Sequence, residues 1–371
     1  MSNMEALKVI ISGGGTGGHI FPAIAIANAL RKINPNTEIL FVGAEGKMEM
    51  EKVPAAGYKI IGLPVRGFQR KLTLSNISFF FKLFQSLKKA KRIIKEFNPD
   101  VVVGVGGFAS GPTLRVATKM GIPTLIQEQN SYPGVTNKLL ASKVNKICVA
   151  YQDMDNYFPT SKIIITGNPV RQDILSLNNK TREEGYMFFG LKGNQKTVLS
   201  LGGSLGALTI NESIYNHIDL FIQNNVQLIW QTGKAFYHKA IEIVQQKNAS
   251  NIKVYDFISR MDYAYSVADV VISRAGAITI SELTLTAKPS ILVPSPNVAE
   301  DHQTKNAMTL VKNDAAMLIT DAEARVKLVE ETIKLLNDEF RLNVYKSNIA
   351  RMAIKNSDEI IAKEIIALTN K

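Results

Sequence analysis

The residues with the clearest chemical potential are glycines that follow short apolar runs. Val9–Ser12 leads into Gly13–Gly18 (GGGTGG), and Val198–Leu201 leads into Gly202–Gly206 (GGSLG). A third segment of this kind is Gly104–Gly111 (GVGGFASG). Glycine between a strand and a helix lets the backbone turn tightly and approach a ligand, and the N–H groups at the helix start favour a phosphate. The spacing therefore predicts a phosphorylated ligand.

Four polar segments also follow predicted strands. They are Glu128–Asn130 (EQN), Gly167–Arg171 (GNPVR), Ser273–Glu282 (SRAGAITISE) and Asp301–Thr304 (DHQT). Ser, Thr, Asn and Asp are frequent helix caps, so each segment alone has a local explanation. Together they are too many polar groups at strand ends to be caps alone, and they favour a shared binding site.

Short β-branched runs alternate with helical patterns, which predicts parallel sheets with helices on both faces. Predicted strands of a first series are Lys8–Ser12, Glu38–Gly43, Val101–Gly104, Thr124–Gln127, Lys146–Ala150 and Lys162–Thr166, with helices at Pro22–Ile33, Ile77–Phe97 and Thr113–Lys119. A second series comprises Thr197–Leu201, Val226–Gln231, Ile252–Tyr255, Asp269–Ser273, Ser290–Val293 and Met317–Thr320. The polar stretch Gln172–Gln195 between the two series is the predicted hinge.

The two series begin alike. When Gly14 is aligned with Gly202, Thr16 falls opposite Ser204. A chain of 371 residues also exceeds what one hydrophobic core usually serves. We therefore expect two similar α/β domains. Ligands of such sheets bind beyond the carboxyl ends of the strands, so the predicted site is a cleft between the halves.

Composition narrows the class of protein. Hydrophobic residues make up 46% and charged residues 20% of the chain, as in ordinary soluble domains. The single Cys148 excludes a disulfide framework, and four scattered histidines disfavour a zinc site. The run before Gly13 is too short for a signal peptide, and no apolar run is long enough to span a bilayer. We expect a protein of the reducing cytoplasm.

The formal charge of +12 indicates an anionic partner: nucleic acid, a membrane surface or a phosphate-rich substrate. No zinc-finger spacing and no aromatic RNA-binding signature occurs, so no nucleic acid is expected. The glycines at 13, 15 and 18 have the form of a dinucleotide fingerprint, which is weak alone. The next predicted strand ends without the acid that would hold a ribose, which disfavours a nicotinamide enzyme. Neither loop is followed by Lys-Ser/Thr, so a Walker-type loop is excluded.

In combination, the motifs resemble one family. They are Gly14–His19 (GGTGGH) with Pro22, Glu128–Asn137, Gly167–Arg171, Gly202–Ala207 (GGSLGA), Ser273–Glu282 and Asp301–Ala307 (DHQTKNA). This order, from about residue 8 to about residue 310, is similar to that of the MurG family. These bacterial enzymes add N-acetylglucosamine from UDP-N-acetylglucosamine to a lipid-linked muramyl-pentapeptide. The chain departs from the family at Leu205, where glutamine is frequent.

The resemblance implies the GT-B fold, in which two Rossmann-like parallel-sheet domains face each other across a cleft. The expected domains are residues 1–171, joined by a C-terminal helix within 355–371, and residues 172–354. The implied reaction is an inverting transfer to the C4 hydroxyl of the acceptor (lipid I to lipid II). It belongs to peptidoglycan synthesis, and so to cell shape and division. The implied location is the cytoplasmic face of the plasma (inner) membrane, with peripheral attachment.

The resemblance also implies which residues bind the donor. Ser204 and its loop would face the diphosphate, Arg171 the nucleotide, the Ile258 backbone the uracil, Glu282 the ribose and Gln303 the sugar. Donor contacts are further implied for Ala277 in the second half and for Thr16, Gly17, Gly18 and Asn130 in the first.

An inverting transfer needs a base to take the proton of the attacking hydroxyl. His19, directly after the glycine loop, is one candidate, and Glu128 is the other. Asp153-Met154-Asp155 is a D-x-D triplet, which holds a metal in a different glycosyltransferase fold. A solvated turn is the favoured interpretation, because glycine loops and Arg171 can neutralise a diphosphate without metal. No metal or other cofactor is expected.

The predicted helix Ile77–Phe97 has two apolar sides. Leu83, Leu87, Ala90, Ile94 and Phe97 form the expected core face. Ile77, Phe80, Phe81 and Phe84 form a second side that continues into Lys88, Lys91 and Lys95. Aromatic residues followed by lysines are typical of a helix that contacts an anionic membrane, which matches the family's membrane-facing patch.

Three alternatives stay open at this stage. One is another lipid-acceptor glycosyltransferase or a UDP-sugar 2-epimerase on the same fold. The second is a nicotinamide oxidoreductase. The third, a pure binding module, is hard to reconcile with so many convergent polar loops.

Overall fold

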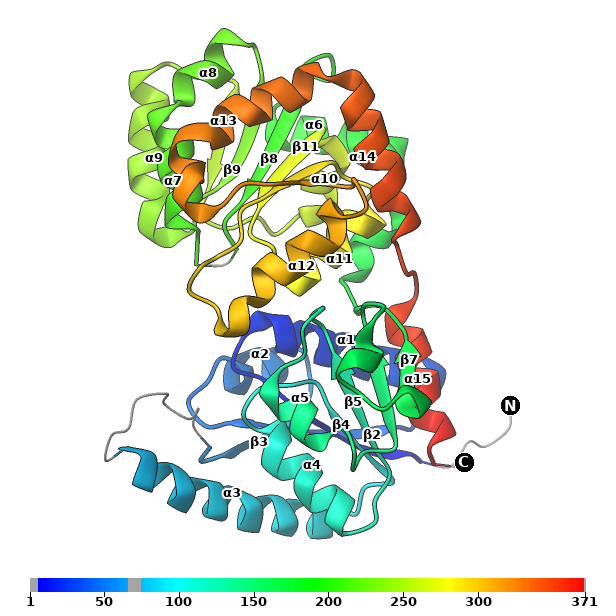
Figure 1. Cartoon of the computed structure of the whole chain (residues 1–371). Coiled ribbons are helices and arrows are strands. Elements are labelled where there is room, and N and C mark those ends of the chain that lie inside the picture. Colours follow the sequence, from blue (N-terminus) through cyan, green and yellow to red (C-terminus); the bar gives the residue numbers. More distant parts are fainter. Residues whose placement is uncertain (1–5, 66–74, 204, 370–371) are drawn as a thin grey trace. The chain divides into compact units, whose positions relative to one another are not determined.

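The computed structural model describes residues 6–65, 75–203 and 205–369. The chain forms two compact units (Figure 1). Unit 1 comprises residues 1–170 and 356–371, and unit 2 comprises residues 171–355. The boundaries expected from the sequence differ from these by a single residue at each crossing.

Unit 1 is built on a seven-stranded parallel sheet with the strand order β3-β2-β1-β4-β5-β6-β7. The strands are β1 (Lys8–Ser12), β2 (Glu38–Ala44), β3 (Lys59–Leu63), β4 (Val101–Gly104), β5 (Thr124–Glu128), β6 (Lys146–Val149) and β7 (Ile163–Ile165). The central strands are apolar at successive positions and fully buried, as in Val9, Ile10 and Ile11. Such runs form because helices cover both faces of a parallel sheet.

Helices cover the two faces of this sheet in separate groups. One face carries α1 (Gly17–Ile33), α2 (Glu49–Ala55) and α15 (Ser357–Ala367). The other carries α3 (Ser75–Phe97), α4 (Ser110–Lys119) and α5 (Val135–Leu140). The last helix, α15, lies against α1, buries Ile361 and Ile365 completely, and pairs Glu359 with Lys32 at 2.7 Å. Helix α15 thus belongs to unit 1.

Unit 2 has a six-stranded parallel sheet with the order β10-β9-β8-β11-β12-β13. Its strands are β8 (Thr197–Leu201), β9 (Gln227–Gln231), β10 (Ile252–Tyr255), β11 (Val270–Ser273), β12 (Ser290–Leu292) and β13 (Met317–Leu318). One face packs around the fully buried Trp230 against α7 (Leu208–Asn216), α8 (Ile218–Gln223), α9 (Lys234–Gln246) and α13 (Asp321–Asn337). Other helices described in this unit are α6 (Asn179–Phe189), α10 (Met261–Val267), α11 (Ala277–Leu285), α12 (His302–Val311) and α14 (Glu339–Arg351).

The two sheets have the same order around their first strands. β1 lies between β2 and β4, and β8 lies between β9 and β11. The alignment of Gly14 with Gly202 is therefore reproduced in space, since each loop follows the corresponding strand. In open parallel sheets, ligands bind where the strand order reverses. In unit 1 this point lies beyond β1 and β4, and in unit 2 it lies beyond β8 and β11.

Two expectations about the elements are wrong. The predicted hinge, 172–195, belongs to unit 2 and contains α6, which packs against α10. The contact is close, because a Cβ atom at Gly185 would lie 2.8 Å from Val267 Cγ1. Helix α1 begins at Gly17, inside the glycine segment, and not at Pro22. Pro22 is therefore the sixth residue of α1, where it has no N–H to donate to the preceding turn.

Candidate functional site

The loops after β1 and β4 touch through their backbones. A Cβ atom at Gly107 would lie 2.3 Å from the Gly14 carbonyl oxygen, and Gly107 has φ +84°. Gly13 is equally close to Val105, whose Cγ2 atom would lie 2.3 Å from an added Cβ. Side chains at these positions would force the loops apart. Gly13 and Gly107 are thus required by the contact between the two loops, a role that the sequence did not reveal.

His19 lies at this contact. Thr16 is the N-cap of α1, and its Oγ1 lies 3.2 Å from His19 Nδ1. The imidazole ring faces the backbone of Gly106, where an added Cβ would lie 2.9 Å from Nε2. The ring is therefore held by its own helix start on one side and by the loop after β4 on the other.

A buried acid that sequence reasoning missed lies beneath the same loop. Glu49, the first residue of α2, is 1% exposed. One carboxylate oxygen accepts the N–H of Gly15 at 2.8 Å, and the other accepts the N–H of Ala44 at 3.0 Å. The only available sequence signal is a glutamate shortly after a strand end, which is too common to be diagnostic. The Gly15 N–H, expected to face a phosphate, is thus already bonded to a carboxylate.

Glu128 ends β5 and is 1% exposed. Its carboxylate accepts two N–H groups of Asn130 at 3.0 and 3.2 Å, the Gly134 N–H at 3.0 Å and an Asn137 side-chain N–H at 2.8 Å. Burial raises the pKa of this carboxyl, and the four hydrogen bonds oppose that rise. All four acceptor directions are used, so Glu128 organises the loop that carries Asn130.

Buried amides join the loops after β4, β5 and β7. The Gln129 side chain donates to the Val105 carbonyl at 2.8 Å and to the Gln127 side-chain oxygen. Gln127 donates to Asn168 at 2.9 Å, and Asn168 donates back to the Gln129 carbonyl at 2.9 Å. Gln129 and Asn168 are 2% exposed and Gln127 is fully buried, so this network has no room for a ligand. It supports the loop after β4, which the His19 ring faces, and the loop that carries Asn130.

In unit 2, the glycine loop after β8 rests on the end of β9. A Cβ atom at Gly206 would lie 2.2 Å from the Thr232 carbonyl oxygen. Gln231 bridges two predicted donor contacts: it donates to the Gly203 carbonyl at 3.1 Å and accepts the Ile258 N–H at 2.9 Å. Ser204 lies outside the described residues, and Leu205 is 89% exposed. The loop and the Ile258 backbone are thus joined by one side chain that the sequence did not single out.

Glu282 lies on α11 with a side chain 14% exposed. Tyr265, fully buried, donates its hydroxyl to Glu282 at 2.9 Å, and Arg171 Nε lies 3.9 Å from the same carboxylate. Burial raises the pKa of Glu282 to about 7, Asp173 adds to the rise, and Arg171 and Tyr265 oppose it. Among the described atoms, Arg171 Nη1 is buried and has no hydrogen-bond partner. The structure therefore brings the predicted pair Arg171 and Glu282 together.

The remaining predicted donor residues lie on neighbouring loops of unit 2. Ala277 opens α11. Gln303, on α12, accepts the Ser295 N–H at 2.8 Å. Arg274, from the same predicted motif, instead donates to the Val293 and Pro294 carbonyls and to Asp321. Arg274 therefore joins the loop after β12 to the start of α13, which is a structural role.

The D-x-D triplet forms an exposed turn. Asp153 and Asp155 are exposed, whereas Met154 between them is buried. Within the described residues, no cluster of three or more His, Cys, Asp or Glu side chains is arranged to hold a metal ion. The exposure of Asp153 and Asp155 agrees with a solvated turn at this position.

Comparison with known proteins covers both units. Residues 9–149 match the glycosyltransferase family 28 N-terminal domain, and residues 197–364 match the family 28 C-terminal domain. A relative from Parabacteroides distasonis is 56% identical over 99% of this chain and 100% of its own length. A second, from Bacteroides fragilis, is 55% identical over 99% of this chain and 97% of its own length. Both are named UDP-N-acetylglucosamine--N-acetylmuramyl-(pentapeptide) pyrophosphoryl-undecaprenol N-acetylglucosamine transferase.

Solved structures agree with this match. The crystal structure of Acinetobacter baumannii MurG has a TM-score of 0.79 and 26% identity, covering 97% of this chain and 99% of that protein. UDP-GlcNAc 2-epimerase from Neisseria meningitidis has a TM-score of 0.68 and 17% identity, covering 97% of this chain and all of that protein, and shares the fold alone. Both units thus have the GT-B architecture expected from the sequence. With two matching domains in the same order and relatives identical over more than half of their positions, the chain belongs to glycosyltransferase family 28.

Proposed function

We propose that this chain transfers N-acetylglucosamine from UDP-N-acetylglucosamine to the C4 hydroxyl of a lipid-linked N-acetylmuramyl-pentapeptide, a step of peptidoglycan synthesis. The observation that carries the proposal is 56% identity, over 99% of the chain, to a relative named for this transfer. The loops beyond the strand ends of both units supply the polar groups that such a reaction needs.

Unit 2 is the proposed donor site. Its glycine loop lies on the backbone of Thr232 and Gly233 and precedes α7. Arg171 has an unpartnered buried Nη1 among the described atoms and faces Glu282. A guanidinium, a helix start and backbone N–H groups favour a diphosphate, and a carboxylate favours ribose hydroxyls. In this proposal Ser204 and Arg171 bind the phosphates, Ile258 the base, Glu282 the ribose, and Ala277 and Gln303 the sugar side.

Unit 1 supplies the base in this proposal. His19 takes the proton of the acceptor C4 hydroxyl, and the hydroxyl oxygen forms a bond to the anomeric carbon. The bond from that carbon to UDP breaks, and UDP leaves with the electron pair. Glu128 is the weaker candidate for the base, because four N–H groups already bind its carboxylate. Thr16, Gly17, Gly18 and Asn130, next to these two residues, are the proposed unit 1 contacts to the substrates.

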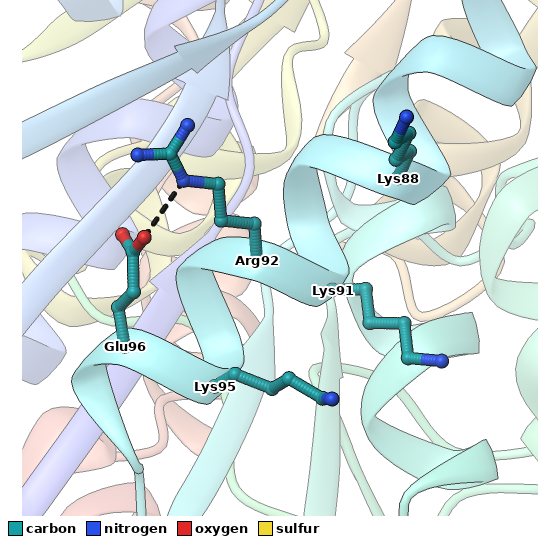
Figure 2. Close-up of a pocket in the computed structure, with 5 residues that line it drawn as sticks. All are labelled: Lys88, Lys91, Arg92, Lys95 and Glu96. Carbon is teal, nitrogen blue, oxygen red and sulfur yellow. Dashed lines mark hydrogen bonds and ion pairs between the residues drawn. The ribbon is translucent and has the colours of Figure 1, made fainter.

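The membrane contact is proposed for α3. Phe81 and Phe84 are 65% and 66% exposed, and Ala90 and Ile94 on the other side are buried. Lys88, Lys91, Arg92, Lys95 and Glu96 line a hollow of about 360 Å³ on this helix, where Lys91 and Lys95 point away from the Arg92–Glu96 ion pair (Figure 2). The side chains of Ile77 and Phe80 lie outside the described residues. No described helix is long and apolar enough to cross a bilayer. We therefore propose peripheral attachment to the cytoplasmic face of the plasma membrane.

Labelled UDP-N-acetylglucosamine with a muramyl-pyrophosphoryl-lipid tests the function. We expect UDP release that depends on the acceptor and a product with inverted anomeric configuration by NMR. Release of UDP without acceptor, or NAD(H) binding in place of UDP binding, would contradict the proposal.

Because Arg171, helix starts and backbone N–H groups are proposed to neutralise the diphosphate, EDTA should leave the rate nearly unchanged. A Mg²⁺-reversible loss would instead restore the metal role of Asp153 and Asp155.

Replacing the proposed base should lower turnover without unfolding the protein. His19→Ala is expected to reduce kcat by about 10²- to 10⁴-fold, the usual cost of losing a general base. The acidic limb of the kcat–pH profile, on which a general base becomes protonated, should change with it. His217→Ala in unit 2, where the ring bonds the Ser213 carbonyl at 3.0 Å, is the control and should leave kcat unchanged. If Glu128→Gln abolishes kcat with an unchanged melting temperature while His19→Ala stays active, the roles are reversed.

Glu282 should make donor binding depend on pH. With a pKa of about 7 in the folded protein, its carboxylate is charged above that pH and protonated below it. We expect the donor KM to rise about tenfold for each pH unit below the pKa. Glu282→Gln should raise the donor KM by roughly ten- to a hundredfold, for the loss of a charged hydrogen bond, and should remove the pH dependence.

The folding stability should change with pH in the direction opposite to that of donor binding. A raised folded pKa stabilises the protein below the unfolded pKa, and this stabilisation is lost as the pH rises through about 7. At pH values above the pKa, Glu282→Gln should therefore melt at or above the wild-type temperature. Glu184→Gln is the matched control, because Glu184 also accepts a tyrosine hydroxyl, that of Tyr263 at 3.0 Å. An equal rise in donor KM for both variants would exclude a ribose contact.

The membrane proposal predicts that membrane binding can be weakened without loss of sugar transfer to a soluble acceptor. Phe81→Ser with Phe84→Ser should weaken binding to vesicles containing anionic lipid, while a soluble acceptor analogue is still turned over. Binding should also weaken with salt, because lysine attraction to anionic lipid is screened. Phe340→Ser with Val326→Ser, at positions in unit 2 that are 81% and 70% exposed, is the control. Vesicle binding that responds to neither salt nor the α3 changes would rule the surface out.

A further inference from the structure

Glu49 is a buried carboxylate placed between two backbone segments of unit 1. Its oxygens accept the N–H groups of Gly15, in the loop after β1, and of Ala44, the last residue of β2. A buried carboxylate is costly unless hydrogen bonds compensate for the lost water. Hydrogen bonds to a charged acceptor are also stronger than those between neutral groups. Glu49 therefore ties the glycine loop to the neighbouring strand.

Two glycines make room for this one side chain. A Cβ atom at Gly14 would lie 2.3 Å from Glu49 Cδ, and a Cβ atom at Gly43 would lie 2.6 Å from Glu49 Cγ. Both distances are shorter than any real contact, so each glycine is needed for the acid to lie where it does. Gly14 and Gly15 have φ values of +145° and +89°. The loop thus adopts backbone conformations that glycine permits and that the carboxylate holds by hydrogen bonding.

The loop held in this way leads directly to the proposed base. Thr16 follows Gly15, occupies the N-cap position of α1 and contacts the His19 ring. The ring also faces the Gly106 backbone. A shift of Gly15 would move Thr16 and the first turn of α1 relative to the loop after β4. Such a shift would misplace the imidazole without altering unit 2.

The carboxylate also distinguishes the two glycine loops electrostatically. In unit 2, the aligned loop rests on the backbone of Thr232 and Gly233. In unit 1, the Gly15 N–H points at Glu49, and a phosphate there would meet a negative charge and a donor already in use. Two loops with similar sequences therefore have different capacities for an anion.

We propose that Glu49 is a positioning residue for the transfer reaction: by binding the Gly15 and Ala44 N–H groups, it holds the first glycine loop in the conformation that places His19. This inference rests on the proposed function only for the identity of the reaction. Glu49 itself does not touch the substrate.

The test uses Glu49→Gln and Glu49→Asp in the full chain. The amide of glutamine presents an N–H to one of two backbone donors, and aspartate is one methylene too short to reach both. We expect kcat to fall on the order of tenfold to a hundredfold, the scale of a misplaced catalytic group. The affinity for UDP, measured by calorimetry, should stay within about twofold, since the proposed nucleotide site in unit 2 is unchanged. Amide hydrogen exchange should become faster in residues 13–19.

Asp100→Asn is the matched control. Asp100 accepts the Lys8 N–H at 2.8 Å, at the opposite end of β1 from the glycine loop. It should lower the melting temperature as much as a Glu49 variant does, yet leave kcat and exchange in residues 13–19 unchanged. If Asp100→Asn lowers kcat as much as the Glu49 variants do, Glu49 contributes only to general stability and the proposal is overturned. Unchanged kcat and unchanged exchange in both Glu49 variants would overturn it as well. If the wild type fails to transfer sugar, the proposed function fails, whereas the exchange measurement still decides the role of Glu49.

Discussion

The structure of unit 1 depends on the backbone contact between the loops that follow β1 and β4. The strand order reverses between these two strands, and in open parallel sheets the loops at such a point diverge and leave a crevice. Side chains at the contact positions would keep the two loops apart. Gly13, Gly14 and Gly107 close that gap by direct contact. This closeness also brings the Gly106 backbone against the His19 ring.

Buried carboxylates and amides then decide where each loop lies. Glu49 and Glu128 are each 1% exposed, and each satisfies its oxygens with N–H groups of a neighbouring loop. In unit 2, by contrast, Glu282 faces Arg171 and Tyr265 and keeps part of its side chain accessible. One strand order thus supports two kinds of site. In the proposed reaction, the first unit positions groups for proton transfer, and the second presents charges to a nucleotide.

Sequence reasoning succeeded where a signal is local and repeated. Alternating β-branched and helical segments predicted two parallel sheets, and the shared glycine segments predicted corresponding places for β1 and β8. It failed where the signal is weak or depends on a distant partner. The stretch 172–195 looked like a hinge because α6 is mostly polar, and only its contact with α10 reveals that it belongs to unit 2. Glu49, Gln231 and Tyr265 were missed because nothing beside them in the chain marks the groups they bind.

The sequence by itself determined the fold class, the family and the set of loops at which we propose that the reaction takes place, because these follow from periodicity and from residue types at short spacing. Only the tertiary structure decided what each loop does. Gly13–Gly18 and Gly202–Gly206 look alike as sequences, yet the first lies on the Glu49 carboxylate and the second on neutral backbone at Thr232 and Gly233. The physical reason is that electrostatic environment and hydrogen-bond partners come from segments far away in the chain, which a local pattern does not encode.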